Sequence, residues 1–398
     1  MSEWIEKRLG ELCEIKIGGT PSRSKREYWD VENSTDNHWV SIRDLNRKVI
    51  DCTAERISDL GVLRSNAKPI KVGTVLLSFK LTIGKVGFAG CDLYTNEAIA
   101  ALESDKLHNE FLYYGLQHWD LLQNVDTAIK GATLNKEKLD KIIVTLPADP
   151  AEQARIARIL STVDEAIEQT EALITKYNRI RTGLMQDLLS ARITEWPQHP
   201  LSQLADVASG ITLGKKHNGP DTVERPYLRV ANVQDGYLNL ADVTTIRLPK
   251  SQVERYELHD GDVLMNEGGD FDKLGRGTVW RSEIAGCLHQ NHVFRVRCQQ
   301  DRLLPDFLAL ISASPYGKRF FVINSKQSTN LASINSTQLK SFPIPLPDVE
   351  EQRRLVEIFA RKTSTLQMHQ QQLAKLQTLK KGLMQDLLAG PKEYEEVS

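Results

Sequence analysis

The sequence is poor in the residues and patterns that hold disulfides, metals and membrane segments. Only five of its 398 residues are cysteine, and none of these forms a C-x-x-C pair. An odd, unpatterned set argues against a zinc ribbon or a redox motif and is typical of a reducing cytoplasm. The first residues lack an apolar signal core, and no uninterrupted apolar run approaches the roughly 20 residues of a membrane helix. We therefore expect a soluble cytoplasmic protein without a membrane partner.

Motifs of catalysis are missing as well. The sequence has no P-loop, no G-x-G-x-x-G after a strand, no H-E-x-x-H and no Asn/Asp-Pro-Pro-aromatic stretch of the kind that amino-methyltransferases use. Gly268 and Gly269 fit a turn better than a phosphate site. His289 and His292 would point to opposite faces of a strand, which argues against a metal site. We expect no catalytic residue, no metal and no cofactor in this chain.

Charge and length limit the possible function and the number of domains only loosely. The chain has 51 Lys and Arg against 52 Asp and Glu, a formal net charge of −1. This balance excludes a uniformly basic nucleic-acid coat, but it allows basic patches, because net charge does not fix how charges are distributed. The length suggests two or more domains.

One stretch is present twice. The heptapeptide Gly-Leu-Met-Gln-Asp-Leu-Leu occupies residues 183–189 and, letter for letter, residues 382–388. A weaker likeness joins residues 39–45 to residues 227–233. We infer that the chain is one unit written twice, with loop insertions and deletions separating the copies.

Each half of the chain carries a β-rich domain. Glycine-broken runs of β-branched and aromatic residues predict strands at 72–79, 86–89, 262–265, 277–281 and 292–297. One amphipathic helix is predicted in each half, at 109–117 and 305–312. Each half therefore contains an α+β domain of roughly 145–150 residues.

A long helix is predicted after each domain. Asp149 and Asp348 can cap it, Pro150 is tolerated at the first helical position, and Glu152 can close a capping box. About 40 residues without an internal glycine follow in each copy, on the order of 60 Å of helix, with apolar residues in an a/d heptad pattern. The residues predicted to pair the helices are Ile156, Ile159, Val163, Leu173, Tyr177, Ile180, Leu184, Leu366, Leu373, Leu376, Leu383 and Leu387.

A helix with one long apolar stripe needs a partner in water. Pairing of the two copies about a pseudo-two-fold axis gives an antiparallel pair with one β-rich domain at each end. The alternative is that the heptads pack each helix onto its own domain, but the stripes are too long for a domain of that size to cover. The predicted fold is α+β, with two pseudo-two-fold-related domains separated by two long antiparallel helices that form a coiled coil.

Loops rich in cations, hydroxyl groups and aromatic rings occur in both domains, notably at residues 18–29 and 214–219. Lys and Arg neutralise phosphates, while Arg, Asn, Gln, Ser and Thr read base edges. For any single residue a solvated surface charge is the commoner role, so the clustering in equivalent loops is what favours nucleic-acid binding. The candidate DNA-binding residues are Thr20, Ser22, Arg23, Lys25, Arg26, Tyr28, Arg43, Lys80, Lys85, Lys130, Lys215, Lys216, His217, Arg229, Lys273, Arg276, Lys326 and Gln327.

This architecture resembles, over essentially the whole chain, the specificity subunit of Type I restriction–modification systems. The motifs that carry the resemblance are Glu152-Gln153-x-Arg155 and Glu351-Gln352-Arg-Arg354 at the helix starts, the repeated heptapeptide at the helix ends, and residues 18–21, 96–99 and 290–293.

The resemblance implies a non-catalytic DNA-recognition subunit. Two target-recognition domains would each read one half of a bipartite site in double-stranded DNA, and the helices would set the spacer length and dock partner subunits. The implied partners are two modification (methyltransferase) and two restriction (nuclease and translocase) subunits, with S-adenosylmethionine, ATP and Mg²⁺ expected in those partners. The implied boundaries are recognition domains at 1–147 and 194–347, spacer helices at 148–193 and 348–390, and a C-terminal tail at 391–398.

Two alternatives stay open at this point. One is a specificity subunit of a methylation-only or phage-exclusion system that has no nuclease. The other is a coiled-coil scaffold whose end domains bind proteins. A neighbouring methyltransferase gene would exclude the scaffold, and a neighbouring helicase–nuclease gene would exclude the methylation-only system.

Overall fold

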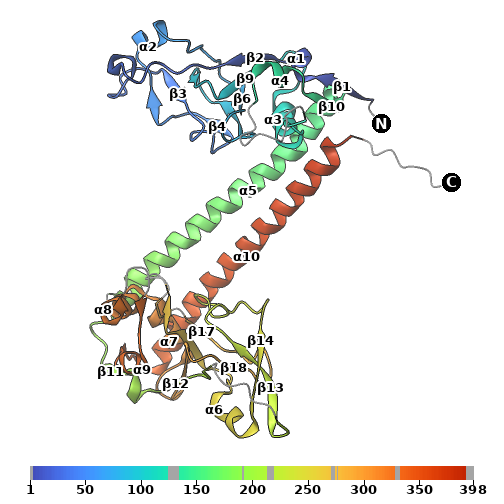
Figure 1. Cartoon of the computed structure of the whole chain (residues 1–398). Coiled ribbons are helices and arrows are strands. Elements are labelled where there is room, and N and C mark those ends of the chain that lie inside the picture. Colours follow the sequence, from blue (N-terminus) through green and yellow to red (C-terminus); the bar gives the residue numbers. More distant parts are fainter. Residues whose placement is uncertain are drawn as a thin grey trace, which may run out of the picture. The chain divides into compact units, whose positions relative to one another are not determined.

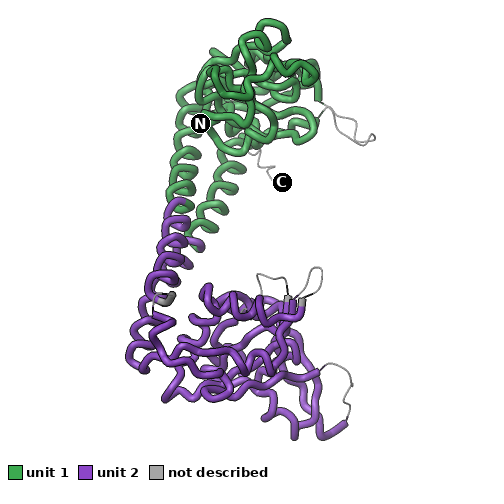
Figure 2. Tube along the Cα trace, turned by 90° about the vertical axis from the view of Figure 1, so that its left-hand side faces the viewer, with its two compact units in different colours: residues 1–171, 371–398 green, residues 172–370 purple. Residues whose placement is uncertain are grey.

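The computed structural model describes residues 3–123, 134–190, 192–212, 219–269, 274–275, 277–327 and 332–390. The chain divides into two compact units (Figure 2), of which unit 1 comprises residues 1–171 and 371–398 and unit 2 comprises residues 172–370. Each unit combines one β-rich domain with parts of both long helices. Among the described residues, no helix is both long and apolar enough to cross a membrane.

The domain of unit 1 is a mixed α+β structure (Figure 1). Its strands are β1 (Trp4–Arg8), β2 (Glu14–Ile17), β3 (His38–Val40), β4 (Val49–Ile50), β5 (Glu55–Arg56), β6 (Val75–Ser78), β7 (Val86–Ala89), β8 (Tyr94–Thr95), β9 (Ile99–Glu103) and β10 (Ile143–Pro147). Its short helices are α1 (Leu9–Leu12), α2 (Asp59–Leu63), α3 (Asn109–His118) and α4 (Lys136–Asp140). A five-stranded sheet has the order β2-β9-β6-β7-β4, a three-stranded sheet the order β5-β3-β8, and β1 pairs with β10.

The domain of unit 2 repeats this plan. Its strands are β11 (Gln198–Pro200), β12 (Ala205–Ser209), β13 (Thr222–Leu228), β14 (Thr244–Pro249), β15 (Val263–Asn266), β16 (Gly268–Gly269), β17 (Gly277–Val279), β18 (Leu288–His289), β19 (Val293–Cys298), β20 (Lys326–Gln327), β21 (Ala332–Ser333) and β22 (Pro343–Pro345). Its short helices are α6 (Val253–Tyr256), α7 (Pro305–Ala313), α8 (Pro315–Asn324) and α9 (Ser336–Lys340). The sheets have the orders β12-β19-β15-β17, β14-β13-β18 and β16-β21-β20, and β11 pairs with β22.

These elements bear out the predicted fold class. The predicted strands appear as β6, β7, β15, β17 and β19, and the two predicted short helices as α3 and α7. The glycine pair that the sequence favours as a turn is instead the strand β16, which pairs with β21. Glycine fits there because a Cβ on Gly268 would come within 2.9 Å of the carbonyl oxygen of Ala332.

The two domains share one backbone frame. In the first, β3 runs parallel to β8, and the Asn96 amide just beyond β8 donates to a β3 carbonyl at 3.0 Å. In the second, β13 runs parallel to β18, and the Gln290 amide just beyond β18 donates to a β13 carbonyl at 2.9 Å. Gly18 and Gly210 are equivalent as well, since a Cβ on either would lie within 2.2 Å of a backbone carbonyl oxygen of the neighbouring strand. The duplication inferred from sequence is therefore visible in the backbone pairing.

A buried glutamine attaches the long helix α5 (Pro150–Leu184) to the first domain. The Gln153 side chain is 2% exposed. Its Nε2 donates to the Pro147 carbonyl at 3.0 Å, and its Oε1 accepts from the His108 amide at 3.1 Å. One side chain thus joins the end of β10, the start of α3 and the first turn of α5.

The equivalent glutamine attaches α10 (Val349–Leu388) to the second domain. Gln352 is fully buried, at 0% exposure. Its Nε2 donates to the carbonyl groups of Pro347 at 2.9 Å and Arg302 at 2.8 Å, and its Oε1 accepts from the Leu304 amide at 2.9 Å. Buried polar groups must be hydrogen-bonded to be tolerated, and this amide binds three backbone groups.

Both helices begin at an aspartate cap. The Asp149 carboxylate accepts from the Ala151 amide at 2.9 Å, and the Asp348 carboxylate accepts from the Glu351 amide at 2.8 Å. The predicted capping box at Glu152 is not the arrangement found. Its carboxylate instead binds the Arg155 guanidinium at 2.6 and 2.8 Å.

Within unit 1, the first half of α5 runs antiparallel to the last half of α10. Ile156 shares a core with Leu388, and further along α5 the Asp164 carboxylate binds Lys380 at 2.7 Å. The Tyr114 hydroxyl of α3 donates to the same carboxylate at 2.7 Å. Asp164 is only 8% exposed, so this three-element contact is a buried polar cluster.

Within unit 2, the last part of α5 runs antiparallel to the first part of α10. The rings of Tyr177 and His369 stack with centroids 5.3 Å apart. Beyond α5, Arg192 binds the Glu351 carboxylate at 2.5 Å. As the chain runs from residue 177 to residue 192, the residue that it contacts on α10 moves back from 369 to 351, which defines the antiparallel direction.

The residues predicted to pair the helices differ in burial. Ile156 and Leu366 are buried, whereas Leu173 is 38% exposed. A straight α-helix drifts by about 20° per heptad from a strict seven-residue repeat, so a heptad position can turn out of the stripe. The others are half-buried: Ile159, Val163, Tyr177, Ile180, Leu184, Leu373, Leu376, Leu383 and Leu387. Buried apolar residues that the pattern missed are Leu160, Leu355 and Phe359.

The two copies of the repeated heptapeptide have different windings. The second copy is α-helical to Leu388, at the end of α10. In the first copy α5 ends at Leu184, and Met185–Ser190 form a π-helix.

Candidate nucleic-acid interface

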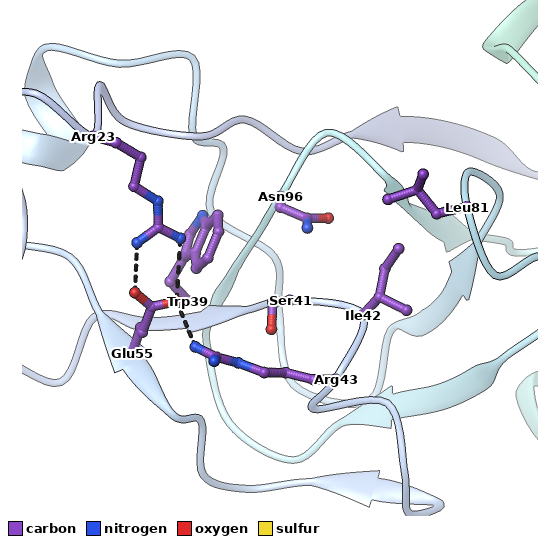
Figure 3. Close-up of a pocket in the computed structure, with 8 residues that line it drawn as sticks. All are labelled: Arg23, Trp39, Ser41, Ile42, Arg43, Glu55, Leu81 and Asn96. Carbon is purple, nitrogen blue, oxygen red and sulfur yellow. Dashed lines mark hydrogen bonds and ion pairs between the residues drawn. The ribbon is translucent and has the colours of Figure 1, made fainter.

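An open depression of about 470 Å³ lies in the domain of unit 1 (Figure 3). It brings together two guanidinium groups, a carboxylate, a hydroxyl, a carboxamide and apolar side chains. Figure 3 shows Arg23 and Glu55 at one end, Leu81 at the other, and Asn96 and Ser41 between them. The lining residues are Arg23, Trp39, Ser41, Ile42, Arg43, Glu55, Leu81 and Asn96.

Glu55 organises the charged end of the depression. Pairing of β3 with β5 places it opposite Trp39. It accepts two hydrogen bonds from Arg23, at 2.5 and 3.1 Å, and one from Arg43 at 2.7 Å. The hydrogen bond from Arg23, and then the charges of both guanidinium groups, hold the pKa of Glu55 below its ordinary value. Two guanidinium groups therefore share the Glu55 carboxylate, and the Asp44 carboxylate lies close enough to oppose part of their charge.

Aromatic rings fix the Arg23 guanidinium. Its carbon lies 3.7 Å from the centroid of the Trp29 ring and 5.0 Å from that of Trp39, a cation–π geometry. The two indoles meet edge to face at 5.0 Å. Their N–H groups donate to loop carbonyls, Trp39 to Gly19 at 3.0 Å and Trp29 to Ser22 at 3.2 Å. The loop at residues 18–29 is therefore held against β3.

Other candidates on this loop have local partners. The Thr20 hydroxyl donates to the Glu97 carboxylate, and this bond lowers the pKa of Glu97. Lys25 donates to the Tyr28 hydroxyl at 3.1 Å. The structure does not support a contact between the Tyr28 ring and DNA, because the side chain is buried at 8% exposure. The exposed candidates of the loop are Ser22, Arg23, Lys25 and Arg26.

Two further candidate cations lie on the loop between β6 and β7. The Lys80 ammonium lies 5.3 Å from the centroid of the Phe79 ring. The Lys85 ammonium donates to the Ile42 carbonyl at 3.4 Å. Both are half-buried, and Ile42 and Leu81 line the depression, so this loop forms one of its walls.

The same frame in unit 2 carries different groups. Arg229, two residues beyond Tyr227, occupies the place that Ser41 holds two residues beyond Trp39. It binds the Asp242 carboxylate at 2.7 Å. Lys326 is exposed on β20, and Gln327 pairs through its backbone with β21. The candidates Lys130, Lys215, Lys216, His217, Lys273 and Arg276 lie outside the described residues.

His289 and His292 of unit 2 do not converge. His289 is fully buried with Nδ1 at 2.6 Å from the Val293 carbonyl oxygen, and burial lowers its pKa to about 4. His292 is exposed, and its Nδ1 lies 2.5 Å from the Glu267 carboxylate. Within the described parts of the chain, no three His, Cys, Asp or Glu residues are grouped in a way that could hold a metal.

Sequence reasoning missed most of the depression. Its overlooked members are Glu55, Trp39, Ser41, Ile42, Leu81 and Asn96. The available signals were the likeness of residues 39–45 to residues 227–233, and the motif at 96–99. Glu55 has no such signal, since it comes from a two-residue strand.

Comparisons with known proteins converge on one family. The model of the Type I restriction modification DNA specificity domain matches residues 1–177 and 194–378. The chain is 26% identical over 254 residues to the specificity subunit of the Type I restriction enzyme EcoKI of Escherichia coli K12, an alignment that covers 58% of this chain and 54% of that protein. The chain spans about half the length of the first curated relatives it matches.

Solved structures show the same fold. The S subunit of a Type I restriction–modification system from M. genitalium matches with a TM-score of 0.60 at 15% identity, over 98% of this chain and 97% of that one. A structure from work on complex assembly and conformational transition of the Type I system matches with a TM-score of 0.55 at 17% identity, over 97% and 98% of the two chains.

Proposed function

We propose, from the premise that this chain belongs to the Type I restriction–modification DNA specificity family, that it is the non-catalytic subunit that selects the DNA site. Its domains at residues 1–147 and 194–347 each read one half of a bipartite site in double-stranded DNA. The helices at 148–193 and 348–390 set the spacer between the half-sites and dock two modification and two restriction subunits. Those partners supply S-adenosylmethionine, ATP and Mg²⁺, and hence the chemistry.

The observation that carries this proposal is one backbone frame with two sets of side chains. Trp39 and Tyr227 hold equivalent register positions, as do Asn96 and Gln290. Domains that keep the frame and change the groups it presents are suited to bind one polymer at two different sequences. Two copies of one reading unit in a single chain suit a site made of two half-sites, as in other half-site readers.

The depression of unit 1 has the chemistry that such reading needs. Arg23 and Arg43 supply guanidinium groups for phosphate or guanine, and Asn96 and Ser41 supply short polar groups for base edges. Glu55 and the two indoles hold Arg23 in place before any ligand binds. Holding a side chain in its bound geometry lowers the entropy that binding must otherwise spend.

The repeated heptapeptide offers a place for partner subunits. A Cβ on Gly183 or Gly382 would meet nothing within 4 Å. Glycine inside a helix costs about 0.8–1.0 kcal/mol relative to alanine, and packing within this chain does not require it at either position. A partner backbone that approaches the helix closely would require it.

Exchange of one recognition domain tests the assignment of half-sites. The complex with its modification subunits is expressed in cells, and methylated adenines are mapped across the genome. Replacing residues 1–145 by the domain of another family member should change one half-site and leave the other half-site and the spacer unchanged. A change in both half-sites would refute independent reading. Methylation by this chain alone with S-adenosylmethionine would refute its non-catalytic role.

Lengthening the helices tests the spacer. One heptad inserted into both helices, after Glu171 and after Gln370, preserves the apolar stripe and adds about 10 Å of helix. The methylated sites should keep both half-sites and gain up to about three base pairs of spacer, at 3.4 Å per base pair. Altered half-sites with an unchanged spacer would contradict this role of the helices.

A further inference from the structure

The loop between β6 and β7 displays a leucine in an unfavourable backbone conformation. Leu81 has φ of +62° and a side chain that is 93% exposed. The Thr82 amide donates to the Lys80 carbonyl at 2.8 Å, so Leu81 is the central residue of a three-residue γ-turn. This turn with positive φ is rare and strained, and positive φ is an outlier for bulky residues.

The rest of the loop holds this turn in place. Ser78, with 0% exposure, donates through Oγ to the Thr82 carbonyl at 2.5 Å and accepts from the Lys85 amide at 3.0 Å. Its own carbonyl accepts from the Gly84 amide at 2.9 Å. Phe79 is 1% exposed. The base of the loop is therefore held firmly by hydrogen bonds and a buried ring. The exposure of Leu81 is not the result of a loosely held loop.

The surroundings of Leu81 indicate what it meets. It lines the depression together with Ile42, opposite the guanidinium end. Ser41 and Asn96 lie between, so the apolar corner adjoins groups suited to base edges. Strain retained at an exposed tip points to a functional contact. In the major groove, the C5-methyl group of thymine is the apolar feature that distinguishes one base from the others.

We propose that Leu81, backed by Ile42, contacts the methyl group of one thymine in the half-site read by the first domain. This inference rests on the proposed function. Because the modification subunits methylate adenine in that proposal, each half-site contains at least one A·T pair and therefore a thymine. Leu81 then contributes discrimination between bases, whereas the neighbouring cations contribute salt-dependent affinity.

Substitution of uracil for thymine tests the contact, because uracil lacks only the methyl group. The full chain with its modification subunits is titrated with duplexes of its mapped site in which each thymine of that half-site, in turn, is replaced by uracil. The native protein should lose about 3- to 5-fold in affinity at one position, the effect of one buried methyl group. L81N, which tolerates positive φ, and L81A should bind the thymine duplex more weakly and show no loss at that position. Uracil in the other half-site is the matched control.

Two results would overturn the proposal. A native complex that binds its mapped site tightly but is insensitive to uracil at every position has no methyl contact, although the proposed function stands. Uracil sensitivity that persists in both L81N and L81A assigns the methyl contact to another residue. Failure of the complex to bind any mapped site would refute the proposed function itself.

Discussion

Replacing Gln352 by alanine should release the start of α10 from the second domain. This buried amide makes three hydrogen bonds to backbone groups, and Gln153 makes two at the equivalent place. At about 1 kcal/mol per intramolecular hydrogen bond, Q352A should lower the free energy of unfolding by about 3 kcal/mol, and Q153A should lower it by about 2 kcal/mol. The second substitution is the internal comparison, because the motif and burial are the same and only the number of bonds differs.

Amide hydrogen exchange measures this effect locally. The Leu304 amide loses its acceptor in Q352A, and the His108 amide loses its acceptor in Q153A. Protection of Leu304 should fall by roughly 100-fold, since 1.4 kcal/mol corresponds to a factor of ten. Q352M keeps the volume and should cost almost as much as Q352A, whereas Q371A, at an exposed position of α10, should change nothing. A loss below about 0.5 kcal/mol in Q352A, or a loss in Q352M much smaller than in Q352A, would refute the reasoning from hydrogen bonds.

Three further predictions concern other contacts. Burial, and then the hydrogen bond to Asp164, raise the pKa of Tyr114 above its ordinary value. The contribution of Tyr114 to the free energy of unfolding should therefore be constant below about pH 10 and fall above it, because the unfolded chain ionises first. Unfolding midpoints between pH 8 and 11 should fall less steeply in Y114F than in the native protein, and an identical slope would contradict the assignment. Alanine at Gly183 or Gly382 should raise the free energy of unfolding by about 0.8–1.0 kcal/mol each. The same substitutions should weaken binding of the modification subunit in a pull-down titration. Tighter binding would argue against docking at these glycines. E55Q should release Arg23 and Arg43 from the carboxylate and so strengthen binding to random DNA, while the ratio of specific to non-specific affinity should fall. Kd values at several salt concentrations measure both affinities. An unchanged ratio would show that Glu55 does not position these arginines.

The sequence predicts the long helices and the duplication well because both signals are local. Capping residues, absence of glycine and a periodic apolar stripe act within one or two helical turns, and an exact repeat needs no structure to be seen. The sequence shows that both glutamines are present, but it does not show that they are buried. The sequence flags Gln153 beside Glu152, but the glutamate binds Arg155 while the glutamine makes the contacts to the domain.

The depression could not be predicted in the same way. Arg23, Trp39 and Glu55 come together through strand pairing and a long loop, and the register of two-residue strands has no periodic signal. The conformation of Leu81 cannot be predicted, because it depends on one hydrogen bond that the buried Ser78 hydroxyl donates and one that it accepts, and the sequence shows only a leucine between polar residues. The sequence does not show that Tyr28 is buried, because most of its neighbours in the loop are polar.

The sequence of the repeated heptapeptide does not by itself determine its backbone conformation. One copy continues as an α-helix, and the other winds as a π-helix from Met185 to Ser190. Identical side chains give identical intrinsic preferences, so the surroundings of each copy must select its winding. A π-turn takes up one extra residue, and one residue corresponds to about 100° of rotation around a helix axis. The π-helix of the first copy therefore changes the direction, around the helix axis, in which the chain leaves α5. The two copies have the same sequence but different backbone conformations.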